Sequence, residues 1–126
     1  YGGWGFWIQS NNKLWWWPQG SQDILDNGSN SITLNKWTHI AVVWNISTKT
    51  ASFYINTVLN SSLTNASAVE KSSGTADFEV GNIRNNLSSG QFVLNGSIAN
   101  ILAYNRLLSS TEISQNYNAT KGRFGL

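Results

Sequence analysis

The fold is decided by two neighbouring stretches, Trp37-Thr38-His39-Ile40-Ala41-Val42-Val43-Trp44-Asn45 and Ala51-Ser52-Phe53-Tyr54-Ile55-Asn56-Thr57. The first stretch is apolar on both alternating sets of positions, as a strand covered on both faces requires. The second alternates, with Phe53 and Ile55 between polar or amphipathic neighbours, which is typical of a strand with one buried face. The residues between them are mostly short and polar, and such side chains favour turns by bonding to nearby backbone. We therefore predict an antiparallel hairpin in which residues 37–45 form a central strand.

A second hairpin is predicted over residues 3–18, with its turn at Asn11-Asn12. A loop of these two residues would set Trp7 opposite Trp16 and make one face of the hairpin wholly apolar. The residues of that face, which we expect in the core, are Trp4, Phe6, Ile8, Trp15 and Trp17. The opposite face would carry a mixture of bare backbone, aromatic plates and an amide, from Gly3, Gly5, Trp7, Gln9, Leu14 and Trp16. This second face is predicted to be a ligand platform.

The remaining β-segments are less regular. We expect a polar loop over residues 19–30, a short strand over 31–34, a rim strand with long loops over 59–74, a strand over 76–80, and a long strand or bent pair over 92–104. Near the end of the chain, Ser109 and Glu112 have the spacing of a capping box, and Leu108 and Ile113 that of a hydrophobic staple. This pattern predicts one helix that continues through Tyr117, ends near Gly122 and lets Phe124 and Leu126 pack on the sheets.

Composition bounds the class of protein. A chain of 126 residues is one domain by the usual prior and buries a real core. There is no cysteine, so no disulfide or thiolate site exists. The eight Lys and Arg residues are scattered and the net charge is only +2, so the basic stripe that nucleic acid needs is missing. No stretch approaches the roughly 20 apolar residues of a membrane span. We predict neither nucleic-acid binding nor membrane insertion.

Several strands, tight turns and one late helix argue for an all-β protein, an antiparallel β-sandwich with a short C-terminal helix. In order, Trp37–Val43, Phe53–Leu59, Phe78–Asn82 and Gly96–Ser109, closed by Glu112-Ile113, resemble the C-terminal part of laminin G-like, concanavalin A-like jelly-roll domains. The ending, residues 116–126, is similar to the tail of such domains in phage virion and bacterial surface proteins. The resemblance implies a single domain over residues 1–126 that lacks its N-terminal strands, being either trimmed or completed by another polypeptide. It also implies a location outside the cell or on a virion surface.

Catalysis is one function to weigh, because folds of this kind also host glucanases with carboxylates alternating along a strand. Asp77 and Glu79 have that alternation, but the third acidic residue of the pattern is absent. A solvated strand face explains them better. His39 has no Ser or Asp partner nearby in sequence, and on a central strand it is more often structural than a base. We therefore predict that the protein is not an enzyme.

Calcium is a second possibility, because many laminin G-like domains bind it with rim loops through carboxylate and carbonyl oxygens. The candidate ligands are Asp23, Asp26 and Asp77. Their spacing alone does not bring them together, so no cofactor is expected beyond this one candidate ion.

Glycan binding is the third possible function. A sugar ring stacks its C–H face on an aromatic ring, and side-chain amides hydrogen-bond its hydroxyls. The side chains of the right types are Trp7, Trp16, Gln9 and Tyr54. The alternative is that the missing strands or a neighbouring subunit cover these aromatics, since large exposed aromatic patches are rare without a partner. Two hypotheses stay open: a surface recognition or adhesion module that binds glycans, and a structural or assembly domain that packs on a neighbouring protein, of a virion or filament, or on another copy of itself.

Overall fold

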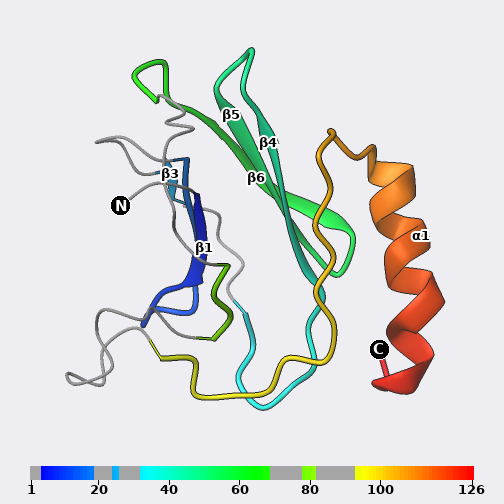
Figure 1. The fold of residues 1–126 in the computed structure, drawn as a ribbon. Coiled ribbons are helices and arrows are strands. Elements are labelled where there is room, and N and C mark those ends of the chain that lie inside the picture. The colour runs from blue at the N-terminus through cyan, green and yellow to red at the C-terminus, as the bar shows by residue number, and fades with distance from the viewer. Residues whose placement is uncertain (1–3, 19–23, 26–31, 69–77, 82–92) are drawn as a thin grey trace.

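A computed structural model describes residues 4–18, 24–25, 32–68, 78–81 and 93–126. Its described strands form two three-stranded antiparallel sheets (Figure 1). Sheet A has the order β1 (Gly5–Ile8), β2 (Leu14–Trp17) and β3 (Ile24–Leu25). Sheet B has the order β4 (Ile40–Asn45), β5 (Thr50–Ile55) and β6 (Val58–Thr64). Helix α1 (Ser110–Thr120) and a 3₁₀ turn, η2 (Lys121–Arg123), end the chain. The predicted all-β fold with one late helix is confirmed.

The hairpin of β4 and β5 is confirmed, with Val42 opposite Phe53 and Asn45 opposite Thr50. Its turn is built as its polar residues suggest, because the Asn45 side-chain oxygen accepts hydrogen bonds from the backbone N–H groups of Ser47 and Thr48 at 3.0 and 3.2 Å. Two details differ from the prediction. The strand begins at residue 40 and not at residue 37, and within the described sheet it is an edge strand, since β5 is central.

The next hairpin explains why β5 is central. Asn56 and Thr57 form a two-residue turn with φ of 47° and 73°, so the chain reverses at once into β6. Left-handed φ at both positions matches the twist of the flanking strands. The rim strand expected over residues 59–74 is therefore present from Val58 to Thr64. Residues 69–74 of that prediction lie outside the described residues.

The pairing register of the hairpin formed by β1 and β2 was predicted wrongly. Ile8 lies opposite Leu14 and Phe6 opposite Trp16, one residue away from the expected pairing. The loop is one residue longer than expected, because Gln9 and Lys13 close it with a backbone hydrogen bond of 2.9 Å and Asn12 takes a φ of 62°. Three-residue loops with a left-handed residue are the next most common hairpin connection after two-residue loops. A slip of one residue turns every side chain of β2 to the other face.

The core lies between the two sheets. Its buried members are Leu14 (1% exposed) and Trp16 (6%) from sheet A, and Ala51 and Phe53 (both 0%) from sheet B. Partly buried side chains that pack against them are Phe6, Ile32, Ile40, Val42, Trp44, Ile55 and Leu63. Phe53 and Ile55 point inward as predicted, and so does Phe6. Trp15 and Trp17, expected in the core, are on the other face of β2.

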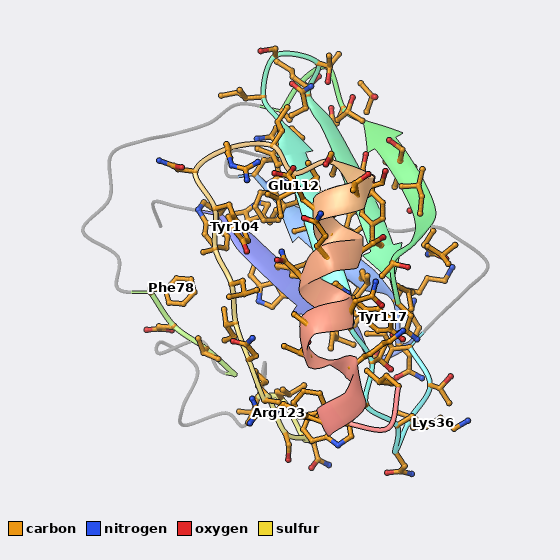
Figure 2. The ribbon with its side chains drawn as sticks, turned by 90° about the vertical axis from the view of Figure 1, so that its right-hand side faces the viewer. Lys36, Phe78, Tyr104, Glu112, Tyr117 and Arg123 are labelled. Carbon is orange, nitrogen blue, oxygen red and sulfur yellow. The ribbon has the colours of Figure 1, made fainter. Side chains whose placement is uncertain are left out.

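Helix α1 is confirmed in detail. Ser109 is the N-cap, its hydroxyl accepts from the Glu112 N–H at 3.3 Å, and the Glu112 carboxylate accepts from the Ser109 N–H at 2.8 Å. The helix lies on the side of sheet B away from sheet A (Figures 1 and 2). Its Tyr117 contacts His39 edge to face at 5.6 Å between ring centroids, and Phe124 beyond it contacts Trp37 at 5.0 Å. The C-terminal residues are thus held to sheet B.

Four other segment predictions fail within the described residues. Residues 24–25, expected in a loop, form β3, whereas residues 32–34, expected in a strand, lead into a turn. Residues 78–80 and 93–104 are not strands. A β-strand is defined by a ladder of backbone hydrogen bonds to a partner strand. In these described segments the Leu94 N–H donates to the Gly81 carbonyl at 2.8 Å, and no ladder forms between them.

Candidate ligand-binding surface

The outer face of sheet A carries a cluster of indoles. Because Phe6, Leu14 and Trp16 point into the core, alternation turns the residues between them outward. We call the outward set, Gly5, Trp7, Gln9, Trp15 and Trp17, the tryptophan face. The Trp7 ring lies 5.6 Å from the ring of Trp15, its cross-strand partner, and 5.6 Å from that of Trp17, with interplanar angles of 54° and 34°.

Trp7 lies over the backbone of Gly5. A Cβ added at position 5 would come within 2.7 Å of Cζ2 and 2.9 Å of Cζ3 of the Trp7 indole, and closer still to Cη2. These three atoms are neighbours in the six-membered ring of the indole. The added Cβ would lie nearest to the middle atom, Cη2, and almost equally close to the two atoms beside it, which places the Cβ over the ring plane and not beside the ring edge. One face of the indole therefore covers the glycine backbone, and the opposite face is turned away from the sheet. Trp7 is accordingly half-buried.

The four side chains predicted to bind a ligand do not form one site. Trp7 is on the tryptophan face, and Gln9 follows it on the same side where the chain turns. Trp16 is buried in the core and stacks on Trp4 at 5.5 Å, so no ligand on the sheet surface reaches it. Tyr54 lies between the inward residues Phe53 and Ile55, hence on the outer face of sheet B. The register error has placed Trp15 and Trp17 where Trp16 was expected.

The tryptophan face offers apolar ring surface and little else. The indole Nε1 of Trp15 is buried and has no hydrogen-bond partner within the described residues. Residues 4–18, which supply both strands, contain no Asp or Glu, and Lys13 is their only charged residue. A ligand of this face is therefore one that stacks. Sequence reasoning missed Trp15 and Trp17 because Asn11 and Asn12 each tolerate left-handed φ, which leaves loop length undecided.

The carboxylates of interest are not brought together by the described structure. Asp23, Asp26 and Asp77 lie outside the described residues, and Glu79 is exposed in a segment without strand pairing. No group of three or more His, Cys, Asp or Glu side chains that could hold a metal ion occurs among the residues the structure describes. The calcium and hydrolase constellations therefore remain sequence predictions.

His39 belongs to the joint between sheet B and α1. Its backbone N–H donates to the Asn56 side-chain oxygen at 3.0 Å, and its carbonyl accepts from the Asn56 N–H at 2.9 Å. Its Nδ1 is buried and has no hydrogen-bond partner in the described ranges. Burial lowers the pKa of the imidazole from its ordinary value of 6.5. These contacts give His39 a structural role, as expected.

None of the helical segments that the structure describes combines the length and the apolar character of a membrane span.

Comparison with known proteins addresses the family. Residues 1–114 match the model of the concanavalin A-like lectin/glucanases superfamily. No curated protein matches the chain significantly. Among solved structures, the chain is similar to residues 221–444 of an S-layer domain-containing protein from Clostridium thermocellum, with a TM-score of 0.52 and 21% identity. The similarity covers 82% of this chain and 50% of that one, so the chain spans about half the length of that fragment. At this identity the likeness shows a shared fold.

Proposed function

Because the chain belongs to the concanavalin A-like lectin/glucanases superfamily, we propose that it is a non-enzymatic recognition module that binds glycans through the tryptophan face. The observation that carries the proposal is the arrangement of Trp7, Trp15 and Trp17 on the side of sheet A away from the core. Aromatic plates beside an amide suit the alternating C–H and hydroxyl surfaces of a sugar. Large aromatic surface outside a core is uncommon without a partner.

The absence of acidic residues from 4–18 supports binding without hydrolysis. Glycoside hydrolases use two carboxyl groups about 5–9.5 Å apart across the scissile bond, and the strands of the tryptophan face supply neither. Asp77 and Glu79 are the pair whose alternation along the sequence matches the pattern of a hydrolase. An Asp77→Asn, Glu79→Gln double variant that retains all measurable glycan binding would agree with the proposal, whereas detection of glycan cleavage that this variant abolishes would contradict it.

We place this module on the surface of a cell or a virion. The reasons are the glycan-binding chemistry of the tryptophan face and the fold shared with a fragment of an S-layer domain-containing protein. Immunogold labelling of intact cells and particles from the source organism tests this location.

The binding proposal is tested by titrating the protein with a panel of neutral oligosaccharides while following tryptophan fluorescence. A binding glycan should change the emission of the wild type, and Trp7→Ala should weaken its affinity at least tenfold. Trp37→Ala is the matched control. Trp37 is an exposed tryptophan that contacts Phe124 and is not part of the tryptophan face. Equal affinity of Trp7→Ala and Trp37→Ala would refute binding through this face.

A second candidate function is assembly, and a different observation favours it. Large apolar side chains are exposed along the extended segment 93–107, namely Val93, Ile98, Ile101, Leu102, Tyr104 and Leu107. Strand β4, whose residues are apolar on both faces, is moreover an edge of the described sheet B. A neighbouring protein that covers this segment would remove its apolar surface from water.

Light scattering during size-exclusion chromatography distinguishes the two functions. Assembly through segment 93–107 predicts a mass above 13.9 kDa that an Ile101→Ser, Leu102→Ser variant returns to the monomer value. A monomer that binds no apolar dye at any concentration would count against assembly.

A further inference from the structure

We propose that Gly5 is a positioning residue that holds Trp7 flat as a stacking plate, and that the plate takes the C–H face of a neutral hexopyranoside of the gluco configuration. This inference rests on the proposed glycan binding and deepens it by naming the ligand class and the residue that shapes the site. It is carried by the contact between position 5 and the Trp7 indole.

The first step is steric. Any side chain at position 5 has a Cβ, and that atom would lie within 2.7–2.9 Å of Cζ2 and Cζ3 of Trp7. Carbon atoms in optimal contact are about 3.5–4.0 Å apart, so the indole would have to shift from its place over position 5. Gly5 is needed here for the space it leaves above its Cα. This is a close approach of ring to backbone of the kind that only glycine permits.

The second step is lateral support. Trp7 lies against Trp15 across the ladder and against Trp17 on the diagonal, each at 5.6 Å between centroids. Trp17 is itself the register partner of Gly5, so the indole that covers Gly5 is brought beside Trp17. One face of Trp7 covers the Gly5 backbone and two tilted rings neighbour it, so we assign the opposite face of this half-buried indole to the ligand.

The third step concerns the ligand. A flat indole face with no carboxylate in either supporting strand favours an uncharged, flat and apolar surface. β-Glucopyranose presents such a surface because its hydroxyls are equatorial, which leaves H1, H3 and H5 on one face and H2 and H4 on the other. Gln9 follows Trp7 by two strand positions on the same side, about 7 Å along the chain. At this spacing we assign to its amide the hydrogen bonds with hydroxyls at the rim of a stacked ring.

Saturation-transfer NMR with cellotetraose tests the stacking mode on the whole chain. Transfer should be strongest to the protons of one ring face, either H1, H3 and H5 or H2 and H4, and should be lost in Trp7→Ala. Even transfer to both faces would overturn the stacking mode while leaving glycan binding intact. Binding of other glycans but not cellotetraose would overturn the ligand class alone. A chain that binds no glycan at all would overturn this inference together with the proposed function.

The role of Gly5 is tested without any ligand. Coupled indoles give an exciton couplet in far-ultraviolet circular dichroism, and the pairs Trp4–Trp16 and Trp16–Trp44 contribute to it as well as the pairs of Trp7. The difference between the wild type and Trp7→Ala gives the part that depends on Trp7, and Gly5→Ala should remove most of that part. Gly96→Ala should leave it unchanged, because a Cβ at position 96 meets nothing nearer than 3.8 Å. An unchanged couplet in Gly5→Ala would overturn the positioning role.

A double-mutant cycle covers the case in which Gly5→Ala folds poorly. Gly5→Ala should lower the urea midpoint in the wild-type background and have little effect in the Trp7→Ala background, because the clash is then absent. Equal effects in both backgrounds would show that Gly5 acts on something other than Trp7.

Discussion

The imidazole of His39 meets the ring of Tyr117 edge to face at 5.6 Å, and this contact joins the start of β4 to the middle of α1. The Lys121 ammonium lies 5.4 Å from the centroid of the same Tyr117 ring. A proton on His39 would therefore place a second positive charge in a half-buried joint that already has one.

This joint predicts that stability falls with acidification below pH 6.5. Burial lowers the pKa of His39 in the folded state, so the unfolded chain binds the proton more readily. The stabilisation is complete above pH 6.5 and declines as the pH falls through the two pKa values. We expect a lower urea midpoint at pH 5 than at pH 7.5, and a smaller difference in His39→Gln. The same pH dependence in both proteins would contradict this role.

The carboxylate of Glu112 predicts a second, separate acid transition. Hydrogen bonds from Arg106 and from the Ser109 backbone and hydroxyl lower its pKa from 4.5 to about 2. Its contribution is present above pH 4.5 and is lost as the pH falls toward 2. The protection factor against amide hydrogen exchange in the first turn of α1, which is the intrinsic rate divided by the observed rate at the same pH, should fall over this range. Glu112→Gln should have the low protection factor at every pH in this range. A wild-type protection factor that does not change between pH 5 and pH 2 would refute the assignment.

The N-cap makes a third prediction about the same helix. Ser109→Ala removes the acceptor for the Glu112 N–H and should cost about 1 kcal/mol of stability. Ser110→Ala is the control, because Ser110 is the first helical residue and is exposed. Thermal or urea unfolding measures both. Equal costs for the two variants would mean that the cap contributes nothing.

The observed register of β1 and β2 predicts that two neighbouring tryptophans, Trp15 and Trp16, contribute unequally to the free energy of unfolding. Trp16 is buried in the core, and its replacement by Ala should cost about 3–5 kcal/mol. Trp15→Ala removes a half-buried ring from the outer face and should cost clearly less. A two-residue loop would bury Trp15 in place of Trp16, and Trp15→Ala would then cost more than Trp16→Ala. Urea unfolding of the two variants therefore decides between the two registers.

The turn between β5 and β6 predicts a stabilising substitution. Thr57 has a φ of 73°, which is strained for a β-branched residue. Thr57→Gly should therefore raise stability by about 1 kcal/mol, the approximate cost of a left-handed L-residue. Thr48→Gly is the control, because Thr48 is also in a turn but is not among the residues with positive φ. A gain in the control and none at position 57 would contradict this explanation.

Local features of this chain could be predicted from sequence where short-range chemistry controls them. The capping box at Ser109 and Glu112 needs only residues within four positions of each other, and it is present as expected. The β4–β5 hairpin was also found, because the apolar pattern and the polar turn agree. The edge position of β4 was not found, since strand order depends on which other segments supply backbone partners.

The assignment of the β1–β2 side chains to the two faces of sheet A depended on the length of one loop. Gly5, Trp7 and Gln9 were assigned to the outer face correctly, but Trp16 was exchanged for Trp15 and Trp17 because the loop has three residues. Asn-Asn is compatible with either loop length. The choice is made by the core, where Leu14 and Trp16 fill the space against Phe53.

The sequence by itself determined the strand-rich class, the β4–β5 hairpin and the final helix, because hydrophobic period and capping chemistry act over a few residues. Only the tertiary structure decided which tryptophans are buried and which form the tryptophan face. Both faces of β2 are apolar, so local pattern is indifferent between them, and the difference in free energy comes from packing against a sheet about 30 residues away in the chain.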